Sequence, residues 1–334
     1  MSSQLHITRS IESIDGLLEI TNHLPQLFVI LLCTALSPTT AAQSINLQHS
    51  TRPESNATPI ISHGMPPPVD INSCQSESRG HELQIENSSV FLPLSKIDSP
   101  HLTGVLEKGA PTLNWWLRSQ NEISHVTIAV ATHETTHWIK KKLTACSGGA
   151  QTYYFNGKIW ATNLRQGETR HISIALRTLP TRYINKQTRR LERYLLLSQR
   201  TPGNQFTVLL DELLAYIGSA QTELALVEAQ RSDLVASGIK IFEGNISGST
   251  ELLLFTLAYL TSLEEASPYE HEVLISTPGV LPLLRNAWAV HLENISRLER
   301  LGDDFQKALS PDFDITREIF SLKFKGALQL ISRN

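Results

Sequence analysis

The chain has little cysteine and no excess of basic residues. Its 334 residues contain 3 cysteines, and 29 Lys plus Arg stand against 32 Asp plus Glu, which gives a formal net charge of −3. No basic face and no interleaving of basic with aromatic residues is present, so nucleic acid is not expected as a partner. Cys74 and Cys146 also lack the spacing of metal ligands, which argues against a cysteine-based zinc site.

The N-terminal region contains an apolar run that is shorter than a membrane span requires. Residues 24–36 are apolar and are followed by a small-residue region at 37–44, with cleavage expected near residues 41–43, an order typical of a cleavable export signal. The run is too short for a comfortable transmembrane helix. The preceding segment is long for a signal and carries three acidic residues, so an anchor is the alternative. We therefore expect residues 1–43 to be a signal peptide or N-terminal anchor, and the mature protein to be exported (periplasmic or secreted) without a stable membrane span.

The segment after this run has little that can form a core. Residues 44–85 are rich in Ser, Thr, Pro, Asn and Gln, so we expect a disordered tail there and a folded domain over residues 86–334. Cys33 would leave with a cleaved signal. The other two cysteines permit a single disulfide between the tail and the domain, and two reduced thiols are the alternative.

The sequence of the domain predicts an α+β fold that is mostly α. A helix is expected after Asp98-Ser99-Pro100, and the pair Asn156-Gly157 predicts a β-hairpin between residues 152–155 and 158–161. Trp115 and Trp116 are expected to be core residues. Strands are also expected at residues 90–92 and 170–176, and helices at about 205–230, 249–265, 279–302 and 314–332.

The pentapeptide His133-Glu134-Thr135-Thr136-His137 is the strongest chemical signal. It lies in a segment with the apolar flanks of a buried helix, which Gly148-Gly149 would end. Residues four apart share a helix face, so both imidazoles can point at one zinc ion. Glu134 is then close enough to act on a zinc-bound water as a general base. Two helix histidines with ordinary hydrogen bonds are the structural alternative.

A catalytic zinc site needs a third protein ligand, and the sequence narrows the choice. A third histidine at HExxHxxGxxH spacing is excluded, because positions 140 and 143 hold Lys and Leu. Two other downstream carboxylates are weaker candidates: Glu168 suits a solvated turn, and Glu192 lies among arginines, with which it can pair. Glu212 lies in an apolar helix, where a carboxylate needs a partner or a metal, so we expect it to be the third ligand.

Three further residues are candidates around this site. Tyr216 lies one turn after Glu212 and so shares its face, where its hydroxyl can donate to a developing oxyanion; a core tyrosine is the alternative. Asp211 can hold a ligand imidazole or pair at the helix surface. His171 is the competing third ligand, and an exposed strand position is its other interpretation.

The HETTH helix with a later helical Glu resembles the gluzincin group of zinc metallopeptidases. The D-E-x-x-A-Y pattern at residues 211–216 is similar to the second signature of several uncharacterised bacterial zincin-like families. The resemblance covers about residues 120–230, and His137 and Glu212 are further apart than in the thermolysin-like members. It implies a zincin-like fold with an active-site helix, a small antiparallel sheet and a C-terminal helical region, one Zn²⁺, and water-promoted peptide hydrolysis.

These observations predict a zinc metallopeptidase that acts on a peptide or protein. His133, His137 and Glu212 are the expected zinc ligands, with Glu134 and Tyr216 as catalytic residues. Three alternatives remain open: a zinc amidase with another substrate, a non-catalytic exported protein with a vestigial or structural zinc site, and a zinc-free helical binding module.

Overall fold

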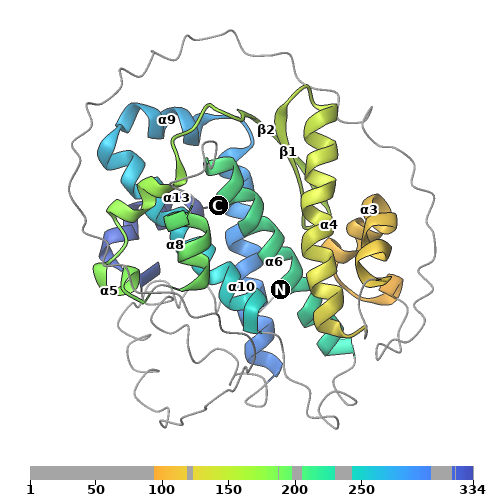
Figure 1. Cartoon of the computed structure of the whole chain (residues 1–334). Helices are drawn as coiled ribbons and strands as arrows, with labels where there is room; N and C mark the ends of the chain where they lie inside the picture. Colours follow the sequence, from red (N-terminus) through yellow and green to blue (C-terminus); the bar gives the residue numbers. More distant parts are fainter. Residues whose placement is uncertain are drawn as a thin grey trace, which may run out of the picture. The chain divides into compact units, whose positions relative to one another are not determined.

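The structure is a computed structural model, and it describes residues 94–118, 123–186, 188–197, 205–229, 243–301, 318–319 and 321–333. In this part of the chain, the fold is mostly helical and includes one small antiparallel sheet of two strands. Helix α6 (Phe206–Ala229) packs against α4 (His125–Cys146) on one side and against α8 (Glu243–Ala266) and α10 (Val280–Leu301) on the other (Figure 1). The expected α+β, mostly α class is therefore confirmed.

Helices α3 (Pro100–Arg118) and α4 begin at the polar caps that their sequences provide. Ser99 Oγ accepts a hydrogen bond from the backbone N–H of Leu102 at 3.2 Å, and Pro100 takes the first helical position, where its missing N–H costs nothing. Ser124 and Thr127 form a reciprocal capping box at the start of α4. The helix predicted after residues 98–100 is confirmed, and α3 packs along α4.

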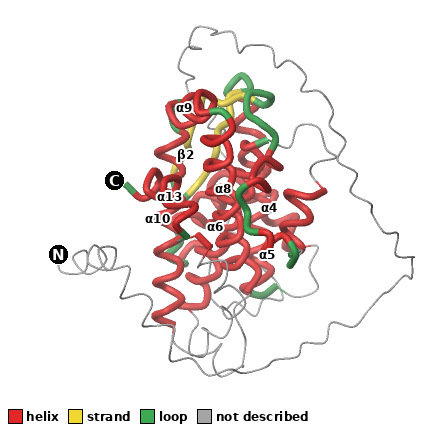
Figure 2. Tube along the Cα trace, turned by 90° about the vertical axis from the view of Figure 1, so that its left-hand side faces the viewer, coloured by secondary structure: helices red, strands yellow, loops and turns green. Residues whose placement is uncertain are grey.

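The predicted β-hairpin is also confirmed and is longer than expected. Strand β1 (Ala150–Phe155) pairs antiparallel with β2 (Lys158–Arg165). Asn156 and Gly157 join them with φ values of 48° and 77°, the left-handed geometry of a tight hairpin turn. Every residue of β1 is buried, and β2 lies beside the turn after α9 (Pro268–Ser276), where Asn163 N–H donates to Pro278 O at 3.4 Å (Figure 2). The hairpin therefore closes the core over α4 and α6.

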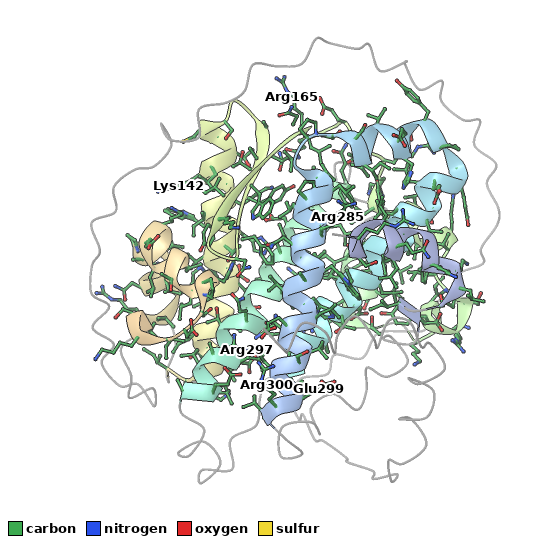
Figure 3. The ribbon with its side chains drawn as sticks, turned by 180° about the vertical axis from the view of Figure 1, so that it is seen from behind. Lys142, Arg165, Arg285, Arg297, Glu299 and Arg300 are labelled. Atoms are coloured by element: carbon green, nitrogen blue, oxygen red, sulfur yellow. The ribbon has the colours of Figure 1, made fainter. Side chains whose placement is uncertain are left out.

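Three apolar clusters include residues of α6. The first joins α6 to α8, α10 and α13 (Lys325–Ser332), the second fills the space between α3, α4 and β1, and a small third one lies between α6, α8 and α10. Arg297 and Arg300 lie on α10, and Arg297 Nε donates to Glu228 of α6 at 3.1 Å (Figure 3). Helix α6 is thus held from both sides, which fixes the residues that it presents to α4.

The strand predicted at residues 170–176 is wrong. His171 makes one isolated bridge to Gln205, and the chain then turns into the 3-10 helix η3 (Ile172–Arg177). The His171 imidazole accepts a hydrogen bond from Ser173 N–H at 3.2 Å and caps this turn. The apolar residues Ile172, Ile174 and Ala175 that suggested a strand are buried by the 3-10 turns instead.

The predicted helix boundaries needed three corrections. Helix α8 begins at Glu243, earlier than the predicted residue 249, and it includes Gly248. Between the helices predicted at residues 249–265 and 279–302, the structure has a further helix, α9, with Pro268 in its first turn. The last helix is shorter than residues 314–332, because the 3-10 turn η7 (Leu322–Phe324) precedes α13. The helices at residues 205–230 and 279–302 are confirmed as α6 and α10.

The prediction that both tryptophans of α3 are core residues is half wrong. Trp116 packs partly buried against the cluster between α3 and α4, whereas Trp115 is 63% exposed. Adjacent helix residues point about 100° apart, so one face of α3 cannot bury both.

The expected signal or anchor (1–43), the tail (44–85), the strand at 90–92 and Cys74 lie outside the described residues. Cys146 is exposed at the end of α4.

One described helical stretch, Asn245–Ala266, is long and apolar enough to cross a membrane by length and composition. Helices α9 and α10 pass the same test only as a pair that bends by 77°. In the structure, 94% of the apolar window in Asn245–Ala266 is buried by other elements, which is typical of a core helix.

Candidate metal centre

His133 and His137 project from consecutive turns of α4 toward α6. Their Nε2 atoms are 3.1 Å apart, and the two rings meet edge to face with centroids separated by 4.8 Å. The four-residue spacing places both imidazoles on the face that packs against α6, as the sequence predicts. Both rings lie in the helix contact, and His133 is mostly buried there.

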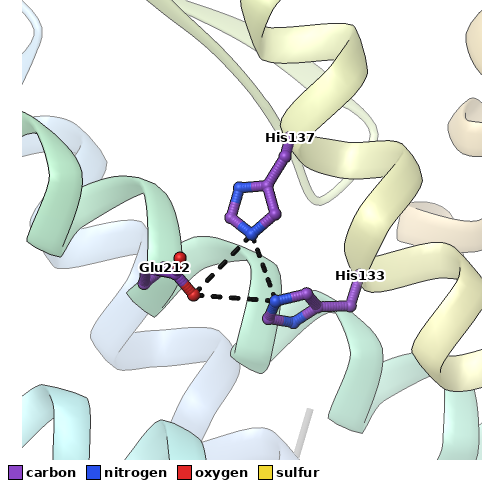
Figure 4. Close-up of side chains that lie close together, drawn as sticks. All are labelled: His133, His137 and Glu212. Atoms are coloured by element: carbon purple, nitrogen blue, oxygen red, sulfur yellow. Dashed lines mark hydrogen bonds and ion pairs between the residues drawn. The ribbon is translucent and has the colours of Figure 1, made fainter. Parts of the chain in front are cut away.

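Glu212 meets this pair from α6. Its Oε2 atom lies 3.6 Å from His133 Nε2 and 3.7 Å from His137 Nε2, so three donor atoms surround one point (Figure 4). Zinc–ligand bonds of about 2.0–2.1 Å in a tetrahedron separate the ligand atoms by roughly 3.3 Å. The measured separations of 3.1, 3.6 and 3.7 Å bracket that value. The separations of the two imidazoles and the carboxylate therefore fit three ligands of one zinc ion.

Asp211 contacts the outer nitrogen of His137. The Oδ2 atom of Asp211 lies 3.1 Å from His137 Nδ1, and the Nζ atom of Lys140 lies 3.7 Å from the same oxygen. A proton held on Nδ1 by this carboxylate leaves Nε2 free for a metal. Of the two roles considered for Asp211, the structure shows the contact to the ligand imidazole as well as a surface pair with lysine.

Comparison of the sequence with protein-family models and with curated proteins, and of the fold with solved structures, found no match.

Tyr194 is a residue of this site that the sequence analysis missed. It lies on a π-helical segment, η4 (Leu191–Leu196), and its hydroxyl donates to Glu212 Oε2 at 2.9 Å. Single π-turns are frequent at functional sites because they re-aim one side chain. Burial and the neighbouring Glu212 carboxylate raise the pKa of Tyr194, so it remains a hydrogen-bond donor.

Without a metal, His137 and Glu212 are charged because they form ion pairs with their neighbours. Burial on its own lowers the pKa of His137, but hydrogen bonds and charges from Asp211 and Glu212 outweigh it and raise the pKa to about 10. Burial likewise favours a neutral Glu212, yet both imidazoles hold the pKa of that carboxyl well below its usual range. Glu212 is therefore ionised, as a metal ligand must be.

Tyr216 packs directly on His133. The two rings meet edge to face at a centroid distance of 4.6 Å, and the Arg190 guanidinium lies 5.2 Å from the centre of the tyrosine ring. Arg190 is in turn fixed by Glu251, whose Oε2 accepts from Nη1 at 3.2 Å. Gly248 of α8 lies against the same ring, because a Cβ atom there would be 2.4 Å from Tyr216 Cδ1. Tyr216 is thus held in a fixed position beside the donor cluster.

His133 Nδ1 is buried and has no hydrogen-bond partner among the described residues. A neutral imidazole that binds metal through Nε2 carries its proton on Nδ1. The Nε2 atom of the same ring faces His137 Nε2 and Glu212 Oε2, so both neighbouring donor atoms lie on the Nε2 side of the ring. Metal-binding imidazoles usually donate their other N–H to a protein group or to water, and among the described residues His133 Nδ1 has no such acceptor, in contrast to His137 Nδ1 beside Asp211.

Glu134 lies on the neighbouring face of α4. It is partly exposed and lines a pocket of about 400 Å³ together with residues of α3 and with Trp138. Within the described part of the chain, its carboxylate forms no hydrogen bond or ion pair, in contrast to Glu212 and Asp211. An accessible and unpaired carboxylate next to the donor cluster is available for proton transfer.

The competing candidates do not reach the cluster. His171 caps η3 and is not among the residues whose donor atoms converge. Glu168 accepts from Arg165 N–H at 2.8 Å in the turn after β2, as its solvated-turn interpretation predicts. Of the carboxylates considered for the third ligand, Glu212 is therefore the one that the structure brings to His133 and His137.

Proposed function

We propose that this chain is a zinc-dependent hydrolase that cleaves peptide or other amide bonds within a zincin-like arrangement of helices. The observation that carries the proposal is the convergence of His133 Nε2, His137 Nε2 and Glu212 Oε2 at separations of 3.1–3.7 Å. Three protein donors with one open position distinguish a catalytic from a structural zinc site. The expected substrate is a peptide or protein outside the cell that exports the enzyme.

The bound ion would supply a Lewis acid that lowers the pKa of a water and polarises an amide carbonyl. In this proposal, Glu134 accepts a proton from the attacking water at a carboxylate oxygen and returns it to the leaving nitrogen. The water oxygen stays on the acyl carbon as the C–N bond breaks. Tyr216 donates its hydroxyl proton in a hydrogen bond to the carbonyl oxygen as that atom gains negative charge.

Two substitutions separate binding from chemistry. Zinc analysis of purified full-length protein should give about one ion per chain, and Glu212→Ala should lose it because a third ligand is removed. Glu134→Gln should keep the zinc and lose hydrolysis of a fluorogenic peptide mixture by at least about 10²-fold, since the general base is absent. Glu168→Gln is the matched control, because its carboxylate lies in a turn outside the site.

The same measurements decide between the proposal and its alternatives. A chain that purifies and reconstitutes without zinc contradicts a metal site and favours a helical binding module stabilised by the His137–Asp211 ion pair. Zinc without turnover of any amide favours a structural or vestigial site. Full activity of Glu134→Gln would remove Glu134 from the mechanism.

A further inference from the structure

A pocket with three tryptophans lies along the face of α4 next to the donor cluster. It has a volume of about 400 Å³ and is lined by Pro111, Thr112, Trp115, Trp116, Glu134 and Trp138. The first four lie on α3 and the last two on α4. Ligand sites of small molecules and side chains begin at about 300 Å³, so the space is sufficient for one large side chain.

Two parallel rows on α4 connect this pocket to the donor cluster. His133 and His137 form one row with four-residue spacing, and Glu134 and Trp138 form the next row with the same spacing. Successive residues of a helix are rotated by about 100°, so the second row lies beside the first, one facing α6 and the other facing α3. Glu134 lines the pocket and is the sequence neighbour of His133, whereas none of the three donor residues lines the pocket, so Glu134 is the residue that relates the pocket to the cluster.

The walls of the pocket differ in rigidity. Trp116 and Trp138 pack partly buried against the apolar cluster between α3 and α4, and Lys142 Nζ lies 3.6 Å from the centroid of the Trp138 ring. Trp115 meets Trp116 edge to face at 4.9 Å and is 63% exposed. Two indoles are therefore fixed by the core, and the third is presented to solvent with a large apolar surface uncovered.

The chemistry of the lining selects its occupant. Thr112 and Glu134 are the polar side chains among the six lining residues. An acidic side chain would be repelled by the Glu134 carboxylate. An aromatic side chain can meet the indoles edge to face or stacked, an arrangement that favours it over an aliphatic one by roughly two- to tenfold.

We propose that this pocket binds an aromatic side chain of a peptide substrate, adjacent to the amide bond that is cleaved. The inference rests on the hydrolytic function proposed above, and it adds the substrate class that this site prefers. Glu134 joins the two parts, because an aromatic side chain held against Trp115 and Trp138 places the neighbouring backbone of the peptide alongside the Glu134 carboxylate.

Binding of small probes to the full-length protein tests the pocket without any turnover. Saturation-transfer NMR is measured with N-acetyl-phenylalaninamide, N-acetyl-alaninamide and N-acetylglucosamine on metal-depleted protein. The phenylalanine probe is expected to bind, and Trp115→Ala should weaken it roughly tenfold because one aromatic wall is lost. Tyr269→Ala on α9 is the matched control, since Tyr269 is an aromatic residue with 70% exposure outside the pocket. Preferential binding of N-acetylglucosamine, or phenylalanine binding that Trp115→Ala leaves unchanged, overturns the proposal.

A paired hydrolysis measurement separates failure of this inference from failure of the proposed function. For zinc-loaded enzyme, kcat/KM is compared for two peptides that differ by Phe or Ala next to the cleaved bond. We expect a preference for Phe of roughly tenfold that falls toward one in Trp115→Ala. Hydrolysis with no such preference overturns the pocket and leaves the hydrolase standing. Probe binding that depends on Trp115 without hydrolysis of any peptide overturns the hydrolase and leaves an aromatic-binding pocket.

Discussion

His137 Nδ1 lies 3.1 Å from Asp211 Oδ2. The next residue, Glu212, approaches the other nitrogen of the same imidazole, with its Oε2 atom 3.7 Å from His137 Nε2. Adjacent residues of α6 thus serve opposite sides of one imidazole. Asp211 contacts the ring at Nδ1 and Glu212 completes the group of three donor atoms, so two adjacent acidic residues meet both nitrogens of His137.

Asp211→Asn should weaken zinc binding without removing a ligand. The amide oxygen can still accept from Nδ1–H, but the negative charge that makes the imidazole a better donor is lost, so we expect a roughly tenfold to hundredfold higher dissociation constant. Competition with a chromophoric chelator measures it. Glu168→Gln removes a carboxylate in the turn after β2 and should leave the constant unchanged. Equal affinities of Asp211→Asn and the parent chain would show that the His137–Asp211 contact does not support the metal.

Tyr194→Phe tests the residue that the π-helical segment adds to the site. The substitution removes the hydroxyl that donates to Glu212 Oε2 at 2.9 Å and keeps the ring in its place. Glu212 then has fewer restraints on its position, and zinc affinity should fall by about tenfold. The melting temperature of the metal-free protein should change little, because an isolated hydrogen bond contributes about 1 kcal/mol. A large loss of stability together with unchanged zinc affinity would assign Tyr194 a structural role only.

Much of the site could be predicted from local sequence. The spacing of His133 and His137 defines one helix face, and the apolar surroundings of Glu212 separate it from Glu168, which lies in a turn. Asn156-Gly157 determines the hairpin because its two residues adopt positive φ readily. Each of these conclusions depends on contacts within a few residues.

The parts that could not be predicted depend on contacts between distant segments. Tyr194 reaches Glu212 from a π-helical turn, which leaves no periodic signal in the sequence. The alternation around Ile172 resembled a strand, and capping by His171 turned it into a 3-10 helix. Neither does the local sequence reveal which of Trp115 and Trp116 is buried, because the position of α4 decides it.

Gly248→Ala should disturb Tyr216. Tyr216 Cδ1 lies 2.4 Å from the position that the new Cβ would take, so the ring must move away from α8 and change its contact with His133. We expect a loss of about 1–3 kcal/mol in the free energy of unfolding and a lower kcat. Chemical denaturation and peptide hydrolysis measure the two effects.

Gly326→Ala is the control for this overpacking. Gly326 lies in α13, and the nearest neighbouring atom, Glu264 Oε2, would be 3.9 Å from an added Cβ. Because space is available, the helix preference of alanine should leave the protein as stable as before or more stable by up to about 1 kcal/mol. Equal losses in both variants would mean that the effect of Gly248→Ala does not come from Tyr216.

His291 should contribute to acid unfolding independently of the metal site. It is buried on α10, where Nδ1 lies 3.2 Å from Ser249 Oγ, and burial lowers its pKa to about 4. Above pH 6.5 the imidazole is neutral in both the folded and the unfolded chain, so it makes no difference to stability. As the pH falls below 6.5, the unfolded chain takes up a proton that the folded chain does not, and stability is lost until the pH passes about 4.

The full difference corresponds to about 3 kcal/mol, since one pKa unit is about 1.4 kcal/mol. His291→Gln should lower the stability at pH 7, because packing around the ring is lost, and should flatten the decline between pH 6.5 and 4. Urea unfolding of metal-depleted protein at a series of pH values measures this slope. His271→Gln on α9, where the side chain is only partly buried, is the control and should retain the decline of the parent chain. A slope in His291→Gln as steep as in the parent would show that other groups cause the acid sensitivity.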